Sequence, residues 1–64
     1  MNVLNFLATM PGLGHTTVTK DELRELLTQT GGQMMAQGSL WEIVSKHLGA
    51  EVYRVTTKRW EGAV

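Results

Sequence analysis

Residues 19–32, TKDELRELLTQTGG, carry the clearest structural signal in the sequence. Thr19 followed three residues later by Glu22 is the pattern of a capping box, in which each side chain accepts a hydrogen bond from a free backbone N–H at a helix start. Three leucines then form a stripe that a helix would bury, and a glycine pair follows. These signals predict a helix over residues 19–30.

The residues before this stretch predict a shorter helix and a strand. Apolar side chains at positions 3, 6, 7 and 10 have the spacing of one helical face, and Pro11-Gly12 follows them. We therefore expect a helix near residues 2–10. Residues 15–18 end in β-branched side chains, which favour a short strand.

The residues after this stretch predict a third helix and a hairpin. Ser39 followed by Glu42 repeats the capping-box pattern, and the apolar spacing that follows predicts a helix near 39–48, with residues 31–38 as a loop or one helical turn. Strands are expected near 51–56 and 60–63, with the hairpin tip near Thr57-Lys58. The expected fold is one α+β domain over residues 1–64, in the order helix, strand, helix, helix, β-hairpin.

This order is that of a winged helix-turn-helix domain, and two stretches resemble one family of that kind. FLATMPGLGHTTVTKDELRELL and LWEIVSKHLGAEVYRVTTKRWEGAV are similar to the DNA-binding effector domains of OmpR- and PhoB-type response regulators. The resemblance implies a small winged-helix-like fold, with residues 39–48 as recognition helix and a wing near residues 52–60. The sequence departs from the family in several respects, among them the few basic residues of the expected recognition helix, where only Lys46 and His47 supply basic character.

Composition narrows the classes of function. The chain has 64 residues, no cysteine and a formal net charge of zero, so disulfide frameworks and thiolate zinc sites are excluded. No run approaches the roughly 20 apolar residues of a membrane span, and the first ten residues do not resemble a signal peptide, so we expect a cytoplasmic protein with no membrane partner. The last nineteen residues carry more basic than acidic side chains, namely Lys46, Arg54, Lys58 and Arg59 against Glu51 and Glu61.

Two groups of polar residues are candidates for DNA contacts. On the expected third helix, Glu42, Ser45 and Lys46 form a stripe opposite the apolar face, and such side chains can bind base edges or phosphates. The alternative is an ordinary solvated helix surface, with Glu42 used in the cap. The candidate phosphate contacts of the hairpin are Arg54, Lys58 and Arg59, and the alternative is that these three residues belong to an ordinary surface.

Trp41 and Trp60 are candidate anchors for a protein partner, because tryptophan is enriched at interfaces. For Trp41 the alternative is a place in the core, whereas Trp60 could instead stack on a base or simply cover the sheet. His15 and His47 form no site by spacing, and no nucleophile–base set or phosphate loop is visible. We therefore expect a non-enzyme without cofactor, metal or small-molecule substrate. It would act as a DNA-binding transcriptional regulator, either as a monomer or as a homodimer. The alternative is a small protein of phage or mobile-element type that binds a larger protein and modulates it.

Overall fold

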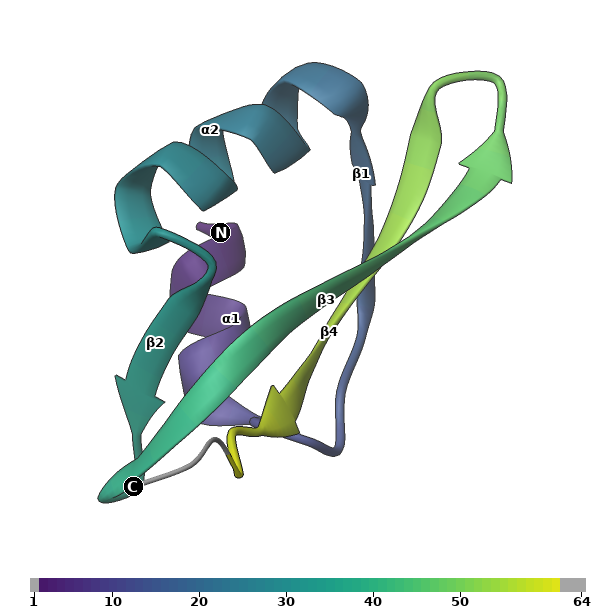
Figure 1. Ribbon diagram of the computed structural model, residues 1–64. Coiled ribbons are helices and arrows are strands. Elements are labelled where there is room, and N and C mark those ends of the chain that lie inside the picture. The colour runs from purple at the N-terminus through teal and green to yellow at the C-terminus, as the bar shows by residue number, and fades with distance from the viewer. Residues whose placement is uncertain (1, 62–64) are drawn as a thin grey trace.

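A computed structural model describes residues 2–61, which form two helices and one curled antiparallel sheet (Figure 1). The expected mixed α+β class is therefore confirmed, whereas the winged-helix arrangement is not. In chain order the elements are α1 (Val3–Thr9), β1 (Thr16–Thr19), α2 (Lys20–Thr30), β2 (Gln33–Ala36), β3 (Ser39–Gly49) and β4 (Val52–Arg59).

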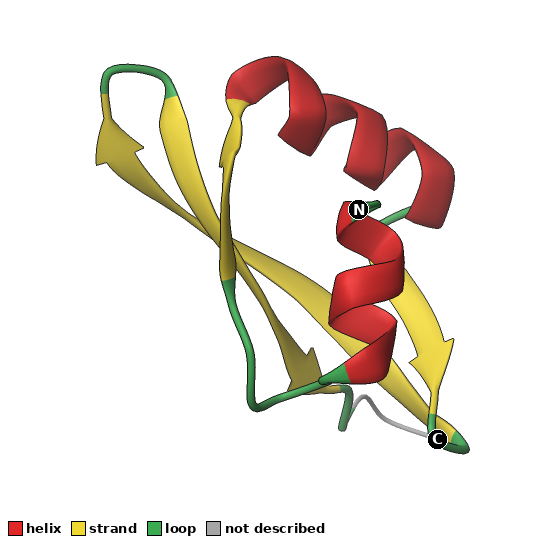
Figure 2. Ribbon diagram, turned by 180° about the vertical axis from the view of Figure 1, so that it is seen from behind, coloured by secondary structure: helices red, strands yellow, loops and turns green. Residues whose placement is uncertain are grey.

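The strands lie in the order β1-β4-β3-β2, and every neighbouring pair is antiparallel. Strand β4, the last strand among residues 2–61, is therefore in the interior of the sheet, between β1 and β3. Seen from behind, α1 lies in front of the strands, so the helices cover one face of the sheet (Figure 2). The part of the β3–β4 hairpin around its turn extends beyond the helices (Figure 1).

The predicted capping box is present at the start of α2. Thr19 Oγ1 accepts a hydrogen bond from the Glu22 N–H at 3.2 Å, and Glu22 Oε1 accepts one from the Thr19 N–H at 2.9 Å. The hydrogen bond from the Thr19 N–H to the carboxylate favours its charged form and lowers the pKa of Glu22 below its ordinary value. At the other end Gly31 adopts the left-handed conformation, with φ of 66°, that commonly ends a helix.

The predicted third helix near 39–48 is wrong, because residues Ser39–Gly49 form β3. The Gln37-Gly38 pair before it has φ of 53° and 76°, which is the geometry of a tight hairpin turn. That turn pairs β3 with β2, a strand in the segment expected to be a loop or one helical turn. Ile43 and Val44 are β-branched and suit a pleated sheet, so long-range pairing prevails over the helical spacing.

The sequence predicts the hairpin in the right part of the chain but predicts its tip at the wrong residues. The turn between β3 and β4 lies at Ala50-Glu51, both with positive φ, whereas Thr57-Lys58 lies within β4. The expected strand at 51–56 is thus part of a longer one. Of the expected strand at 60–63, Trp60 and Glu61 lie outside any strand, and 62–63 lie outside the described residues.

The core lies between the helices and the covered face of the sheet. Its buried apolar side chains come from both helices and all four strands, namely Leu7, Val18, Leu23, Leu26, Met34, Ala36, Ile43 and Val55. The loop before β1 is attached to the same face, because the Gly12 N–H donates to the buried Thr57 hydroxyl at 2.6 Å. Neither helix within residues 2–61 has the length and apolar character needed to cross a membrane.

Candidate functional site

The two faces of the sheet differ in what covers them. Side chains alternate between the faces along each strand, and one set packs under the helices. The other set forms a surface that neither α1 nor α2 covers, which we call the open face. By alternation and cross-strand register it carries Leu40, Glu42, Val44 and Lys46 of β3, Arg54, Thr56 and Lys58 of β4, Met35 of β2 and Thr17 of β1.

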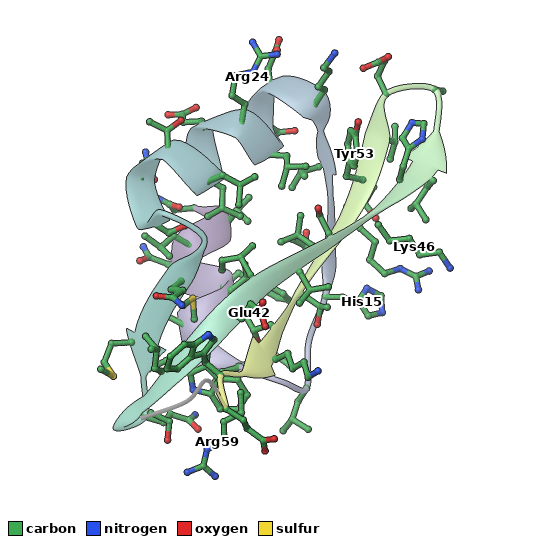
Figure 3. The ribbon with its side chains drawn as sticks, in the orientation of Figure 1. His15, Arg24, Glu42, Lys46, Tyr53 and Arg59 are labelled. Carbon is green, nitrogen blue, oxygen red and sulfur yellow. The ribbon has the colours of Figure 1, made fainter. Side chains whose placement is uncertain are left out.

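Basic side chains lie next to each other on the open face. Lys46 is directly opposite Arg54 in the β3–β4 register, and both are exposed. Like charges directly opposite each other destabilise an antiparallel pair, so this arrangement opposes folding. Figure 3 shows Lys46 reaching outward from the hairpin, with Glu42 further down the same strand. Among residues 2–61 the one ion pair within 4 Å joins Lys20 to Glu51, away from this face.

A second pair on the open face combines opposite charges. Glu42 is directly opposite Lys58 and both are exposed, while Val44 and Thr56 lie between this pair and Lys46–Arg54. The Thr56 hydroxyl donates to the Gly14 carbonyl at 3.1 Å and so already has a partner. The face therefore carries three cations and one carboxylate along the hairpin, so it is positive although the formal net charge of the whole chain is zero.

The sheet brings together four of the six residues predicted to contact DNA and separates the other two. Glu42, Lys46, Arg54 and Lys58 share the open face. Ser45 does not, because alternation along β3 turns it toward the other face, opposite Val55. Arg59 lies opposite Trp41 on that same face, at the end of β4 near the bottom of Figure 3. The stripe expected from helical spacing is therefore wrong.

The two tryptophans differ in their surroundings. Trp41 is partly buried, packs against the core and donates from Nε1 to the Ala36 carbonyl at 3.0 Å. Its ring lies so close to Gly12 that a Cβ there would be 2.9 Å from Trp41 Cζ3. Trp60 is 38% exposed, and its N–H donates to the Leu40 carbonyl at 2.9 Å. Trp41 thus has a structural place, while Trp60 extends the open face.

The two histidines have different surroundings. His15 lies exposed in the loop before β1, and the His47 ring is 4.9 Å from the ring of Tyr53. No group of three potential metal ligands of the His, Cys, Asp or Glu type occurs within residues 2–61.

Sequence reasoning missed Thr17, Met35 and Leu40, because each belongs to the open face only through strand pairing. Met35 and Leu40 could have been predicted from the Gln37-Gly38 pair between two apolar runs, which is a weak form of a hairpin signature. Comparisons of the chain with protein-family models, with curated proteins and with solved structures found no significant match.

Proposed function

We propose that this protein binds duplex DNA through the open face of the β3–β4 hairpin, without catalysing a reaction. The observation that carries the proposal is the direct cross-strand pairing of Lys46 with Arg54, with Lys58 on the same face. Two neighbouring cations that repel each other in the free protein are stabilised when an anion binds between them. A polyanion would place a further negative charge beside Lys58 as well.

The dimensions of the hairpin support a duplex as this polyanion. Lys58 and Arg54 are four residues apart on one strand, which corresponds to about 13 Å at ~3.3 Å per residue. Duplex DNA presents about eight phosphate charges over that length, at one per ~1.7 Å of helix axis. A two-stranded β-ribbon also fits the major groove, where Glu42 can accept a hydrogen bond from the amino group of cytosine. The sequence predicts DNA contacts from a recognition helix, and we propose these contacts for a hairpin instead.

Fluorescence anisotropy with a labelled random-sequence duplex tests the proposal. Three phosphate contacts predict that log affinity falls with log salt concentration with a slope of about −2.7. Lys46→Ala and Arg54→Ala should each reduce the slope by about 0.9. Arg24→Ala is the matched control, because it removes an exposed arginine of α2, which is not part of the open face. Absence of binding at low salt, or an equal loss in the control, would contradict the proposal.

A second candidate function is binding to a larger protein, and one surface patch favours it. Leu13 is 90% exposed and Met10 is 43% exposed, next to a shallow cavity of about 260 Å³ lined by Asn5, Phe6, Thr9 and Met10. This patch belongs to α1 and the following loop, not to the open face. If this patch is the surface that binds the protein partner, Leu13→Ser should abolish that binding and leave any DNA affinity unchanged.

A further inference from the structure

A row of apolar side chains crosses the open face at the end of β4. Met35 lies opposite Leu40 in the β2–β3 register, and the hydrogen bond from the Trp60 N–H to the Leu40 carbonyl continues the β3–β4 register by one residue. Met35, Leu40 and Trp60 therefore follow one another across three segments, and we call them the apolar row. Met35 is 69% exposed and Trp60 is 38% exposed, so the row is accessible.

The apolar row is continuous with the basic surface. Lys58 precedes Trp60 by two residues, so the backbones of these two residues are about 7 Å apart at ~3.3 Å per residue of extended chain. Lys46 and Arg54 follow about 13 Å further along the hairpin, at ~3.3 Å per residue. One ligand lying along the hairpin would therefore meet an aromatic side chain first and then three cations.

We infer that the apolar row binds an unpaired nucleobase, so that the preferred ligand is a DNA duplex that ends in a single-stranded overhang. The inference rests on the proposed function, because it assigns the phosphates of the same ligand to Lys58, Lys46 and Arg54. An indole stacks on the face of any base, and Lys58 is near enough to hold the adjoining phosphate.

Geometry favours an unpaired base over a base inside a duplex. Inside a duplex the faces of the bases are covered by their neighbours, and proteins reach only the base edges through the grooves. A base at a single-stranded end exposes its face. Met35 suits such a partner as well, since its flexible thioether adapts to flat surfaces of different outline and makes favourable contacts with aromatic rings.

The test compares two ligands that share one duplex and differ in a two-nucleotide overhang carrying 2-aminopurine. The overhang ligand should bind about tenfold more tightly than the blunt duplex, since stacking is worth about one power of ten per base. The 2-aminopurine fluorescence should be quenched on binding. Trp60→Ala should remove both the tighter binding and the quenching, while Trp60→Phe should retain part of each.

The controls separate this inference from the proposed function. Trp60→Ala should leave the affinity and salt slope for the blunt duplex unchanged, and its circular dichroism should match the parent protein. Blunt-duplex binding without a gain from the overhang would overturn the inference alone, and no binding to either ligand would overturn both. An equal loss for both ligands in Trp60→Ala, or equally tight binding of the single strand by itself, would also overturn the inference.

Discussion

The starts of α2 and β3 carry the same four-residue pattern and adopt different structures. Thr19 and Glu22 form a capping box with both hydrogen bonds present, at the start of the eleven-residue helix α2. Ser39 to Glu42 begins an eleven-residue strand. The capping pattern by itself therefore does not decide between helix and strand.

What differs is the context on either side of the pattern. The residues after Thr19 are strong helix formers, while those after Ser39 include tryptophan, isoleucine and valine. Before Ser39 lies a tight turn that returns the chain onto β2, so backbone groups at the start of β3 have partners across the hairpin. A helix there would give up that pairing. A capping pattern thus predicts a helix only where no hairpin turn precedes it.

The largest expected effect distinguishes strand from helix in residues 39–49. Helical spacing puts Ile43 and Val44 in the core together, whereas in β3 Ile43 is 9% exposed and Val44 is 38% exposed. Ile43→Ala should therefore cost about 2–5 kcal/mol of unfolding free energy, as a buried truncation does. Val44→Ala should cost about 1 kcal/mol or less, through strand propensity. Urea denaturation of both variants measures the difference, and equal losses would contradict the strand.

The next effect compares the two capping patterns directly. Thr19→Ala removes a side chain that accepts the Glu22 N–H and should destabilise the protein by about 0.5–2 kcal/mol. Ser39→Ala removes no cap and should change stability by less than about 0.5 kcal/mol. The two midpoints in urea are compared at neutral pH, and a similar loss in both variants would show that Ser39 caps a helix.

The capping box also predicts a pH dependence. The pKa of Glu22 is lowered in the folded protein by the hydrogen bond from the Thr19 N–H. Its contribution to stability is therefore complete above the unfolded-state pKa and is lost as the pH falls through the lower, folded-state pKa. In an NMR titration the pKa of the Glu22 side chain should lie below the ordinary value for a glutamate. An unshifted or raised pKa of Glu22 would show that the box does not form in solution.

A smaller effect is expected at the turns that bound β3. Ala50 has φ of 51°, a left-handed conformation that costs an ordinary residue roughly 1–2 kcal/mol and asparagine less. Ala50→Asn should therefore stabilise the protein by up to about 1 kcal/mol, raising Tm by a few degrees. Gly38→Ala is the opposite control, because φ is 76° with nothing near the added Cβ, and it should lower Tm. A fall in Tm for Ala50→Asn would contradict this turn geometry.

The smallest effect identifies the partner of Glu42. In a helix Glu42 would face Lys46 four residues on, whereas in the sheet it is opposite Lys58. A double-mutant cycle between Glu42 and Lys58 should give a coupling of about 0.2–1 kcal/mol, screened by salt. The cycle between Glu42 and Lys46 serves as the control and should give the weaker coupling, and the reverse ranking would favour a helix.

The parts of the fold that sequence could predict are those set by neighbours in the chain. Helices α1 and α2 follow from caps, apolar spacing and closing glycines, and the strand between them, β1, follows from its β-branched residues. β2 and β3 were missed because each depends on a partner strand, and the short run Gln33–Ala36 has no local signal that distinguishes a strand from a loop. For the candidate site, the basic residues were recognisable from their charge. Their common face was not, because it depends on the register between β3 and β4.

The interior position of β4 has a consequence for the order of folding. Residues Thr16 and Val55 are paired although they lie near opposite ends of the chain, whereas β2, β3 and β4 are joined by tight turns. Pairing of distant segments requires closing a long loop, which makes it slower than forming a local hairpin. On the ribosome, α1 and β1 are synthesised first, yet β1 has no strand to join until β4 has emerged. Strand β1 is therefore an early-synthesised element whose pairing waits for a late one.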